Sequence, residues 1–188
     1  RENCSLAGRN TFGMDVKADC LAEWSSPDEL RTLLGTVERP YLLVGGGSNL
    51  LFTADFKGTI LHSTIDSIEI VRETQDSVLV RVGAGVVWDD FVAYAVLNGW
   101  WGVENLSAIP GEVGASAVQN IGAYGVEAKD AIETVQTISL DNGKTRDFSN
   151  AECRYAYRQS IFKNELKGQY AVTYVQFRLS RVAQPRLG

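Results

Sequence analysis

Two pairs of strand-like runs, each joined by a short polar turn, most strongly limit how this chain can fold. Residues 68–73 and 78–82 form the first pair, and residues 132–140 and 144–148 flank Asp141-Asn142-Gly143 in the second. Alternation of apolar and polar side chains is typical of strands, and Asn-Gly between two such runs indicates a hairpin. The sequence therefore predicts antiparallel pairing.

Helices are fewer and do not alternate regularly with the strands. Ser26-Pro27-Asp28-Glu29 has the spacing of a helix start, in which Ser26 and Glu29 each satisfy a free backbone donor, and Gly35 ends the helix. Apolar residues between Trp88 and Val96 recur at helical spacing, and Asn98-Gly99 follows them. This order predicts an α+β protein and argues against a doubly wound parallel sheet.

A seam near Ser63 to Asp66 suggests two lobes, residues 1–64 and residues 65–188. The first lobe contains short apolar runs at residues 41–44 and 59–61, and the second ends in a long β-prone run at residues 170–179. We expect each lobe to be built around strands of its own.

Composition excludes several classes of protein. The 188 residues carry a net charge of −5 without a basic cluster, which disfavours a nucleic-acid or anionic-membrane surface. The sequence has no membrane-spanning run and no signal-like N-terminus. Cys4, Cys20 and Cys153 are widely spaced, and there is one histidine, so we expect reduced thiols, no metal centre and a cytoplasmic location.

The strand-like run 41–44 leads directly into Gly45-Gly46-Gly47-Ser48-Asn49. Glycines after a strand bring backbone N–H groups close to an anion, and Ser48 and Asn49 add side-chain donors. The segment matches neither the dinucleotide fingerprint nor the Walker loop, and the glycines alone fit a tight structural turn equally well. Gly83-Ala84-Gly85 also precedes a helix, but close packing explains it better.

Residues 105–125 are rich in Gly, Ala and Ser and show no clear period, which is typical of a functional segment in a compact domain. Small side chains leave room for a flat ligand to lie against backbone. Arg158, among the aromatic residues of 155–160, is a candidate for stabilising negative charge, with a solvated arginine at a core edge as the alternative. For His62 a structural role is favoured over a catalytic one, and we assign no role to Glu112.

Taken in order along the chain, these segments resemble the UDP-N-acetylenolpyruvoylglucosamine reductase family. The resemblance runs through nearly the whole chain. It is carried by Asn10-Thr11-Phe12, residues 43–51, Gly83-Ala84-Gly85, Glu104-Asn105-Leu106, Ile109-Pro110-Gly111, residues 119–125 and residues 157–162.

The resemblance implies a two-lobed FAD-binding domain of the vanillyl-alcohol oxidase/p-cresol methylhydroxylase type. It also implies that NADPH reduces noncovalently bound FAD, which then passes hydride to the enolpyruvyl group of a UDP-sugar to give UDP-N-acetylmuramate for peptidoglycan. Arg158 and Tyr157 would be the catalytic residues. The implied cofactor-binding residues are Gly45, Gly46, Gly47, Ser48, Asn49, Leu50, Ile109, Pro110, Gly111, Gly114, Ala115, Ser116, Asn120, Gly122 and Tyr124.

Members of that family continue into a substrate-binding domain that supplies the proton donor, and the sequence here has no matching motif after residue 162. We therefore expect a fragment that does not turn over by itself, with a UDP-sugar and NADPH as small-molecule partners and no obligate protein partner. Two alternatives stay open: the FAD-binding subunit of another flavoprotein oxidase or dehydrogenase, and a noncatalytic binding module of the same fold.

Overall fold

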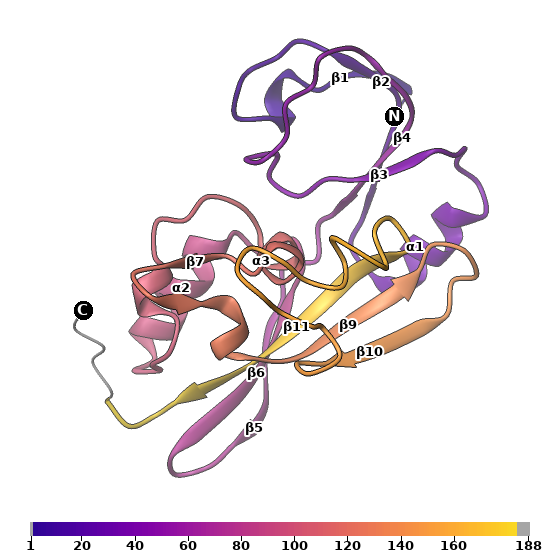
Figure 1. Ribbon diagram of the computed structural model, residues 1–188. Coiled ribbons are helices and arrows are strands. Elements are labelled where there is room, and N and C mark those ends of the chain that lie inside the picture. The colour runs from indigo at the N-terminus through magenta and orange to yellow at the C-terminus, as the bar shows by residue number, and fades with distance from the viewer. Residues whose placement is uncertain (1, 184–188) are drawn as a thin grey trace.

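The computed structural model describes residues 2–183, which form two sheet-based lobes with helices packed against them (Figure 1). The helices are α1 (Pro27–Leu34), α2 (Trp88–Leu97) and α3 (Val113–Gln119), with single 3-10 turns at η1 (Ala7–Arg9), η2 (Glu104–Leu106) and η3 (Ala128–Asp130). The strands are β1 (Glu2–Ser5), β2 (Lys17–Trp24), β3 (Tyr41–Leu43), β4 (Phe56–Ser63), β5 (Ile68–Glu73), β6 (Ser77–Gly83), β7 (Gly122–Ala123), β8 (Val126–Glu127), β9 (Ile132–Ser139), β10 (Thr145–Ser149) and β11 (Tyr170–Ser180).

The first sheet has the strand order β1-β2-β4-β3 among the described residues. β1 pairs antiparallel with β2, whereas β2 and β3 both run parallel to β4. Strands that run parallel in one sheet need a crossover connection between them. Here α1 makes that crossover between β2 and β3, and its buried Leu30 faces the sheet. Because β3 lies at the edge of this sheet, the chain that leaves it is free to face the second lobe.

The second sheet has the order β10-β9-β11-β6-β5 and is antiparallel throughout the described residues. Val78, Val80 and Val82 alternate along β6 and are fully buried on one face. They share a core with α2 and α3, where the rings of Phe91 and Phe177 lie 4.7 Å apart. The face under the two helices is therefore the main core of the molecule.

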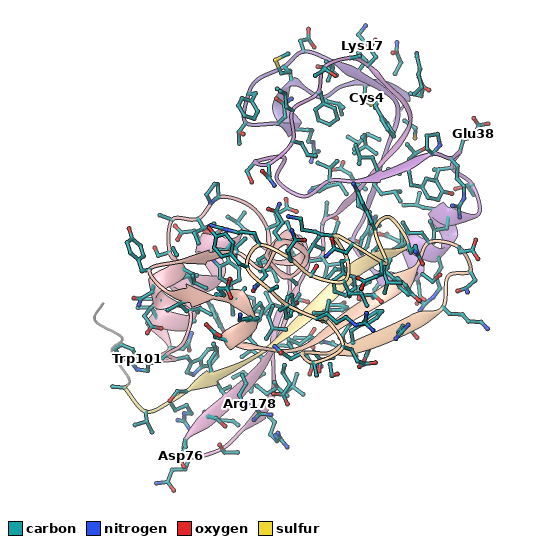
Figure 2. All side chains as sticks on the ribbon, viewed as in Figure 1. Cys4, Lys17, Glu38, Asp76, Trp101 and Arg178 are labelled. Carbon is teal, nitrogen blue, oxygen red and sulfur yellow. The ribbon has the colours of Figure 1, made fainter. Side chains whose placement is uncertain are left out.

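A second core cluster joins the two lobes. Trp24, Leu30 and Leu61 from the first lobe pack with Ile138 and Ala171 from the second. The seam predicted at residues 63–66 lies between the end of β4 and the start of β5, and Figure 2 shows Cys4 and Lys17 on one lobe with Asp76 and Arg178 on the other. The assignment of residues 1–64 and 65–188 as separate subdomains stays a proposal.

Both predicted hairpins and the helices α1 and α2 are confirmed. Residues 83–85 pack closely, as expected, since a Cβ on Gly83 would lie 2.3 Å from the Ile65 carbonyl oxygen. Strands β1 and β2 were not predicted. Val96 was expected on the buried face of α2 but is half exposed, because the apolar face of that helix is narrower than the pattern suggested.

The capping prediction at α1 is correct for Ser26 and wrong in one detail for Glu29. The Ser26 hydroxyl accepts a hydrogen bond from the Glu29 backbone N–H at 3.2 Å. The Glu29 carboxylate, however, accepts from the backbone N–H and hydroxyl of Ser25, at 2.6 and 2.8 Å. The Glu29 carboxylate pairs with Ser25 rather than with Ser26 because Ser25 offers two donors to one carboxylate oxygen.

Candidate functional site

The glycine loop follows the edge strand β3 and turns sharply toward the second lobe. Val44 extends the parallel pairing by donating to the Leu61 carbonyl at 3.0 Å. Gly47 then adopts a φ of +67°, and a Cβ there would lie only 2.0 Å from the carbonyl oxygen of Arg9. Gly47 therefore permits the tight turn. At this position the loop lies too close to the backbone of Arg9, the last residue of η1, to accommodate a side chain.

The segment 105–125, which showed no clear period in the sequence, contains most of η2, the helix α3 and the short strand β7, which pairs with β8 just after the segment. The helix begins next to the glycine loop and is fixed by tertiary hydrogen bonds, from Val113 to the Val86 carbonyl and from Gly114 to the Ala84 carbonyl, both at 2.9 Å. A Cβ on Gly114 would lie 2.8 Å from the Cβ of Ala84. Gly114 therefore allows α3 to pack tightly on the second sheet.

The glycine loop and this segment meet at one cavity. The Ser48 hydroxyl donates to the Pro110 carbonyl at 3.3 Å, and the Asn49 amide donates to the Gln119 side chain at 2.9 Å. The cavity is lined by Ser48, Asn49, Trp88, Ile109, Pro110, Gly111, Glu112, Ala115, Ser116, Gln119, Ile121 and Arg158. Two segments about 60 residues apart in the sequence thus form one binding surface.

Most of the predicted cofactor-binding residues lie at or beside this cavity. Those that line it are Ser48, Asn49, Ile109, Pro110, Gly111, Ala115 and Ser116, together with Arg158. Gly45 and Gly46 lie beside the wall, since a Cβ added to Gly45 would meet Glu112 and one added to Gly46 would meet Gly111. The predicted residues that do not line it are Gly47, Leu50, Gly114, Asn120, Gly122, Tyr124 and Tyr157. Trp88, Glu112, Gln119 and Ile121 are lining residues to which the sequence analysis assigned no role in binding.

Tyr157 and Arg158 occupy the corner of a tight turn closed by hydrogen bonds between Ala156 and Gln159, at 3.0 and 3.2 Å. Arg158 has a φ of +55°, which is uncommon for a residue with a side chain. Its guanidinium donates to the Gly122 carbonyl at 2.8 Å, which directs the cation into the cavity wall. Tyr157 is 80% exposed, so its ring extends away from this contact.

Asn120 holds that turn in place. Its side chain is fully buried, donates to the Ala156 carbonyl at 2.9 Å and accepts from the Lys129 backbone at 3.0 Å. A φ of +48° ends α3 at this residue, a conformation that asparagine tolerates better than most side chains. The structure thus links Asn120 to the placement of Arg158, which the sequence did not indicate.

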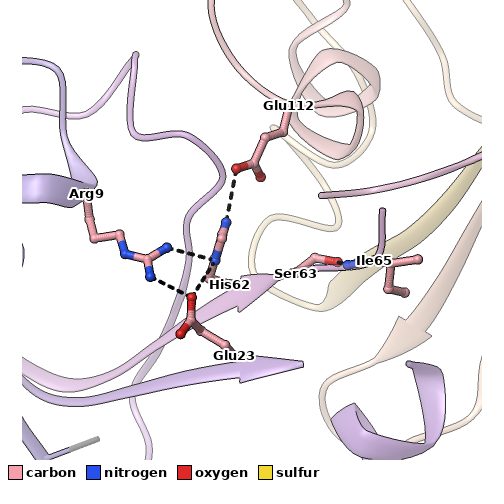
Figure 3. A network of polar contacts seen from close by, with 6 residues as sticks. All are labelled: Arg9, Glu23, His62, Ser63, Ile65 and Glu112. Carbon is pink, nitrogen blue, oxygen red and sulfur yellow. Dashed lines mark hydrogen bonds and ion pairs between the residues drawn. The ribbon is translucent and has the colours of Figure 1, made fainter. Parts of the chain in front are cut away.

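A polar network connects the first lobe to the cavity wall (Figure 3). His62, at the end of β4, has its Nε2 3.0 Å from Oε1 of Glu112 and its Nδ1 3.3 Å from Oε1 of Glu23. Arg9 donates to the same Glu23 oxygen at 2.6 Å, and its other terminal nitrogen lies 3.2 Å from Nδ1 of His62. No spacing in the sequence could have revealed these contacts.

The network shifts the protonation of its members. The hydrogen bond to Glu112 raises the pKa of His62 above 6.5 and outweighs the opposing effect of burial. Burial alone would raise the pKa of Glu23, but hydrogen bonds from His62 and Arg9 dominate and lower it below 4.5. The network therefore favours the protonated form of His62 and the ionised form of Glu23.

The residues that line the cavity are chemically compatible with a flavin nucleotide. Gly45 and Gly46 have no side chains, which leaves their backbone accessible at one end of the cavity. An added Cβ on Gly46 would lie 3.6 Å from the Cα of Gly111. Ile109, Pro110 and Ala115 offer a flat apolar wall, and Arg158 supplies a cation. Among residues 2–183, no group of histidine, cysteine or acidic side chains is arranged to hold a metal ion, and no helix is long and apolar enough to span a membrane.

Comparison with known proteins agrees with this geometry. The family model described as FAD binding domain matches residues 18–149. A UDP-N-acetylenolpyruvoylglucosamine reductase from Bacteroides fragilis is 61% identical over 94% of this chain and 54% of its own length. The chain thus spans about half the length of the curated relatives it matches.

Solved structures show the same fold. The crystal structure of UDP-N-acetylenolpyruvylglucosamine reductase from Thermus caldophilus superposes with a TM-score of 0.80 at 25% identity, covering 98% of this chain and 63% of that one. p-Cresol methylhydroxylase superposes with a TM-score of 0.60 at 14% identity, covering 92% of this chain and 37% of that one. The predicted vanillyl-alcohol oxidase/p-cresol methylhydroxylase type of fold is confirmed.

Proposed function

Because this chain belongs to the FAD binding domain family, we propose that it is the flavin-holding part of a UDP-N-acetylenolpyruvoylglucosamine reductase. One observation carries the proposal: the glycine loop, the wall from Ile109 to Ser116 and the Arg158 guanidinium meet at a single cavity. A phosphate-binding loop, a flat wall and a cation are the parts that a flavin and an anionic substrate require.

The side chains and backbone of this chain would divide the work as follows. Backbone N–H groups of Gly45 to Asn49 would bind the pyrophosphate, and the Ser48 and Asn49 side chains would exchange their present protein acceptors for phosphate oxygens. Residues Ile109 to Ser116 would lie along the ring system. When bound, FAD supplies the hydride that reduces the enolpyruvyl double bond.

Arg158 would act on the substrate. Hydride addition to an enolpyruvyl group builds negative charge toward its carboxylate, and a fixed cation stabilises that charge. The turn at Tyr157 and Arg158 is held by Asn120 and by Lys163, whose ammonium donates to the Arg158 carbonyl at 2.9 Å. An anchored turn keeps the guanidinium at the cavity, and the neighbouring Tyr157, which is exposed outside the cavity lining, would be accessible to the substrate.

The remaining parts of the proposal concern partners and location. NADPH would be the reductant, FAD would be held noncovalently, and the UDP-sugar would be bound in part by a further domain of the reductase. The wide spacing of Cys4, Cys20 and Cys153, which favours reduced thiols, supports work in the cytoplasm. Without that further domain the chain would bind FAD but not complete the reaction.

The first test is flavin binding by the chain itself. The purified chain is expected to be yellow, to release FAD on denaturation and to quench the fluorescence of added FAD when stripped. Gly46→Val should weaken binding, because its side chain would extend toward Gly111 across the loop junction. The matched control is Gly8→Val, where an added Cβ meets nothing within 4 Å and binding should not change. A colourless, folded chain that does not bind FAD would favour the noncatalytic alternative.

The second test separates this reductase from other flavoproteins. In the reductase that contains this chain, Arg158→Ala should slow reoxidation of the reduced flavin by the UDP-enolpyruvyl sugar while FAD stays bound. Arg154→Ala is the control, because Arg154 is 67% exposed in its side chain and pairs with Glu165 at the surface. Unchanged reoxidation in the Arg158 variant, or activity on another substrate only, would contradict the proposed role.

A further inference from the structure

A carboxylate lies where an anionic ligand is proposed to bind. Glu112 lines the cavity, its side chain is only 13% exposed, and an added Cβ on Gly45 would lie 3.2 Å from its Oε2. A partly buried carboxylate repels a pyrophosphate at short range, because the local dielectric screens the charges poorly. The glycine loop therefore needs a compensating cation on its protein side.

His62 is placed to supply that cation. Its ring is 11% exposed, with Nε2 facing one carboxylate and Nδ1 facing another, Glu23. A neutral imidazole carries a single N–H and can donate to only one of them, whereas an imidazolium donates to both. With Arg9 included, two cations balance two carboxylates when the ring is protonated, and loss of the proton leaves an excess negative charge beside the loop.

These are the charged groups that face His62, and each comes from a different element. Arg9 ends η1, Glu23 belongs to β2, and Glu112 immediately precedes α3. Oε2 of Glu112 lies where a Cβ added to Gly45 would approach within 3.2 Å, while Oε1 faces His62. Any change in the charge of the ring is therefore felt at the loop through a single carboxylate.

We propose that protonated His62 is the counter-charge that lets the FAD pyrophosphate bind beside Glu112, so that affinity for FAD falls when the ring loses its proton. This role rests on the proposed function, since it takes the glycine loop as the pyrophosphate site. His62 is a positioning and charge-balancing residue, not one that touches the reacting atoms. Linkage of one proton to binding allows the dissociation constant to rise by at most about tenfold per pH unit.

The test is a titration of the flavin-free chain with FAD from about pH 6 to about pH 9, followed by quenching of flavin fluorescence. In the unaltered chain the dissociation constant should rise with pH. In His62→Gln it should be raised at the lowest pH and stay level across the range. Adding Glu112→Gln to that variant should restore tight binding, because the repelling charge is gone.

FAD titrations of two further variants complete the test. Glu112→Gln alone should bind FAD more tightly than the unaltered chain at the high end of the range, so the proposal stays testable even if His62→Gln fails to fold. Glu133→Gln, which breaks an ion pair with Arg178 on the second sheet, should leave the pH profile unchanged.

The failure of this proposal is distinguishable from failure of the proposed function. If His62→Gln keeps the pH profile of the unaltered chain, or if the double variant binds no better than His62→Gln, the counter-charge role is overturned while FAD binding stands. If the folded, unaltered chain binds no FAD at any pH, the proposed function falls and this role falls with it.

Discussion

Replacing Gly47 by alanine should damage the glycine loop far more than the same change at Gly13. The two glycines have nearly equal positive φ values, +67° and +62°. Around Gly13 an added Cβ meets nothing within 4 Å, whereas at Gly47 it would lie 2.0 Å from the Arg9 carbonyl oxygen and 2.9 Å from the Cα of Asn10. The pair thus separates backbone strain from steric overlap.

The magnitude follows from these two terms. A left-handed conformation costs an alanine about 1–2 kcal/mol, which applies at both positions. Overlap adds about 1–3 kcal/mol at Gly47 alone, unless the obstructing backbone moves. Arg9 and Asn10 resist movement: Arg9 pairs with Glu23, and the Asn10 side chain is hydrogen-bonded to Leu6 and Met14. We therefore expect Gly47→Ala to cost about 1–3 kcal/mol more than Gly13→Ala.

Urea unfolding followed by circular dichroism measures this difference, and a FAD titration of each variant measures its effect on the site. Gly47→Ala should lower the unfolding midpoint further and weaken FAD binding, while Gly13→Ala should leave binding intact. If both variants lose the same stability and bind FAD equally well, then Arg9 does not constrain the loop and the close approach plays no part in shaping it.

Three further changes can be checked on the same chain. Asn120→Ala removes bonds to the Ala156 carbonyl and the Lys129 N–H and should cost about 2–4 kcal/mol in urea unfolding; a loss under about 1 kcal/mol would show that this asparagine does not anchor the turn. Burial raises the pKa of the Cys153 thiol to about 11, so iodoacetamide at about pH 8 should label it only after unfolding, as mass spectrometry would show; labelling of the folded chain would contradict its burial. The raised pKa of His62 stabilises the fold fully below pH 6.5, and that contribution is lost as the pH rises through the folded-state value. The single histidine resonance should therefore titrate above 6.5, and the urea midpoint should fall with pH unless His62 is replaced by Gln.

Local signals allowed half of the fold to be predicted. The β9–β10 hairpin follows from Asp141-Asn142-Gly143, where Gly143 has a φ of +69°, and α2 follows from buried residues at helical spacing. Helix α3 gave no such signal, because Gly114, Ala115 and Ser116 show no contrast between an apolar and a polar face. It is helical because tertiary packing against Ala84 selects it, and packing of that kind has no period in the sequence.

The structure brings the two main predicted segments together at one cavity, and the sequence did not indicate the contacts that join them. Ser48 and Pro110 are 62 residues apart and form a hydrogen bond, a proximity that follows only from the tertiary fold. The contact between His62 and Glu112 spans 50 residues and was equally hidden. Spacing rules detect partners on one element, and these partners lie on different ones.

The glycine loop is held between the two ends of one charged network. At Gly47 an added Cβ would overlap the backbone of Arg9, and at Gly45 it would lie 3.2 Å from the carboxylate of Glu112. Arg9 and Glu112 are joined through Glu23 and His62, so the shape of the loop and the charge beside it depend on the same four side chains. Because both positions are glycines, no side chain separates the loop from the network. Neutralising His62 should therefore affect the position of the loop as well as its electrostatics. Gly45→Ala should push the Glu112 carboxylate away from the loop and so weaken the dependence of FAD affinity on pH.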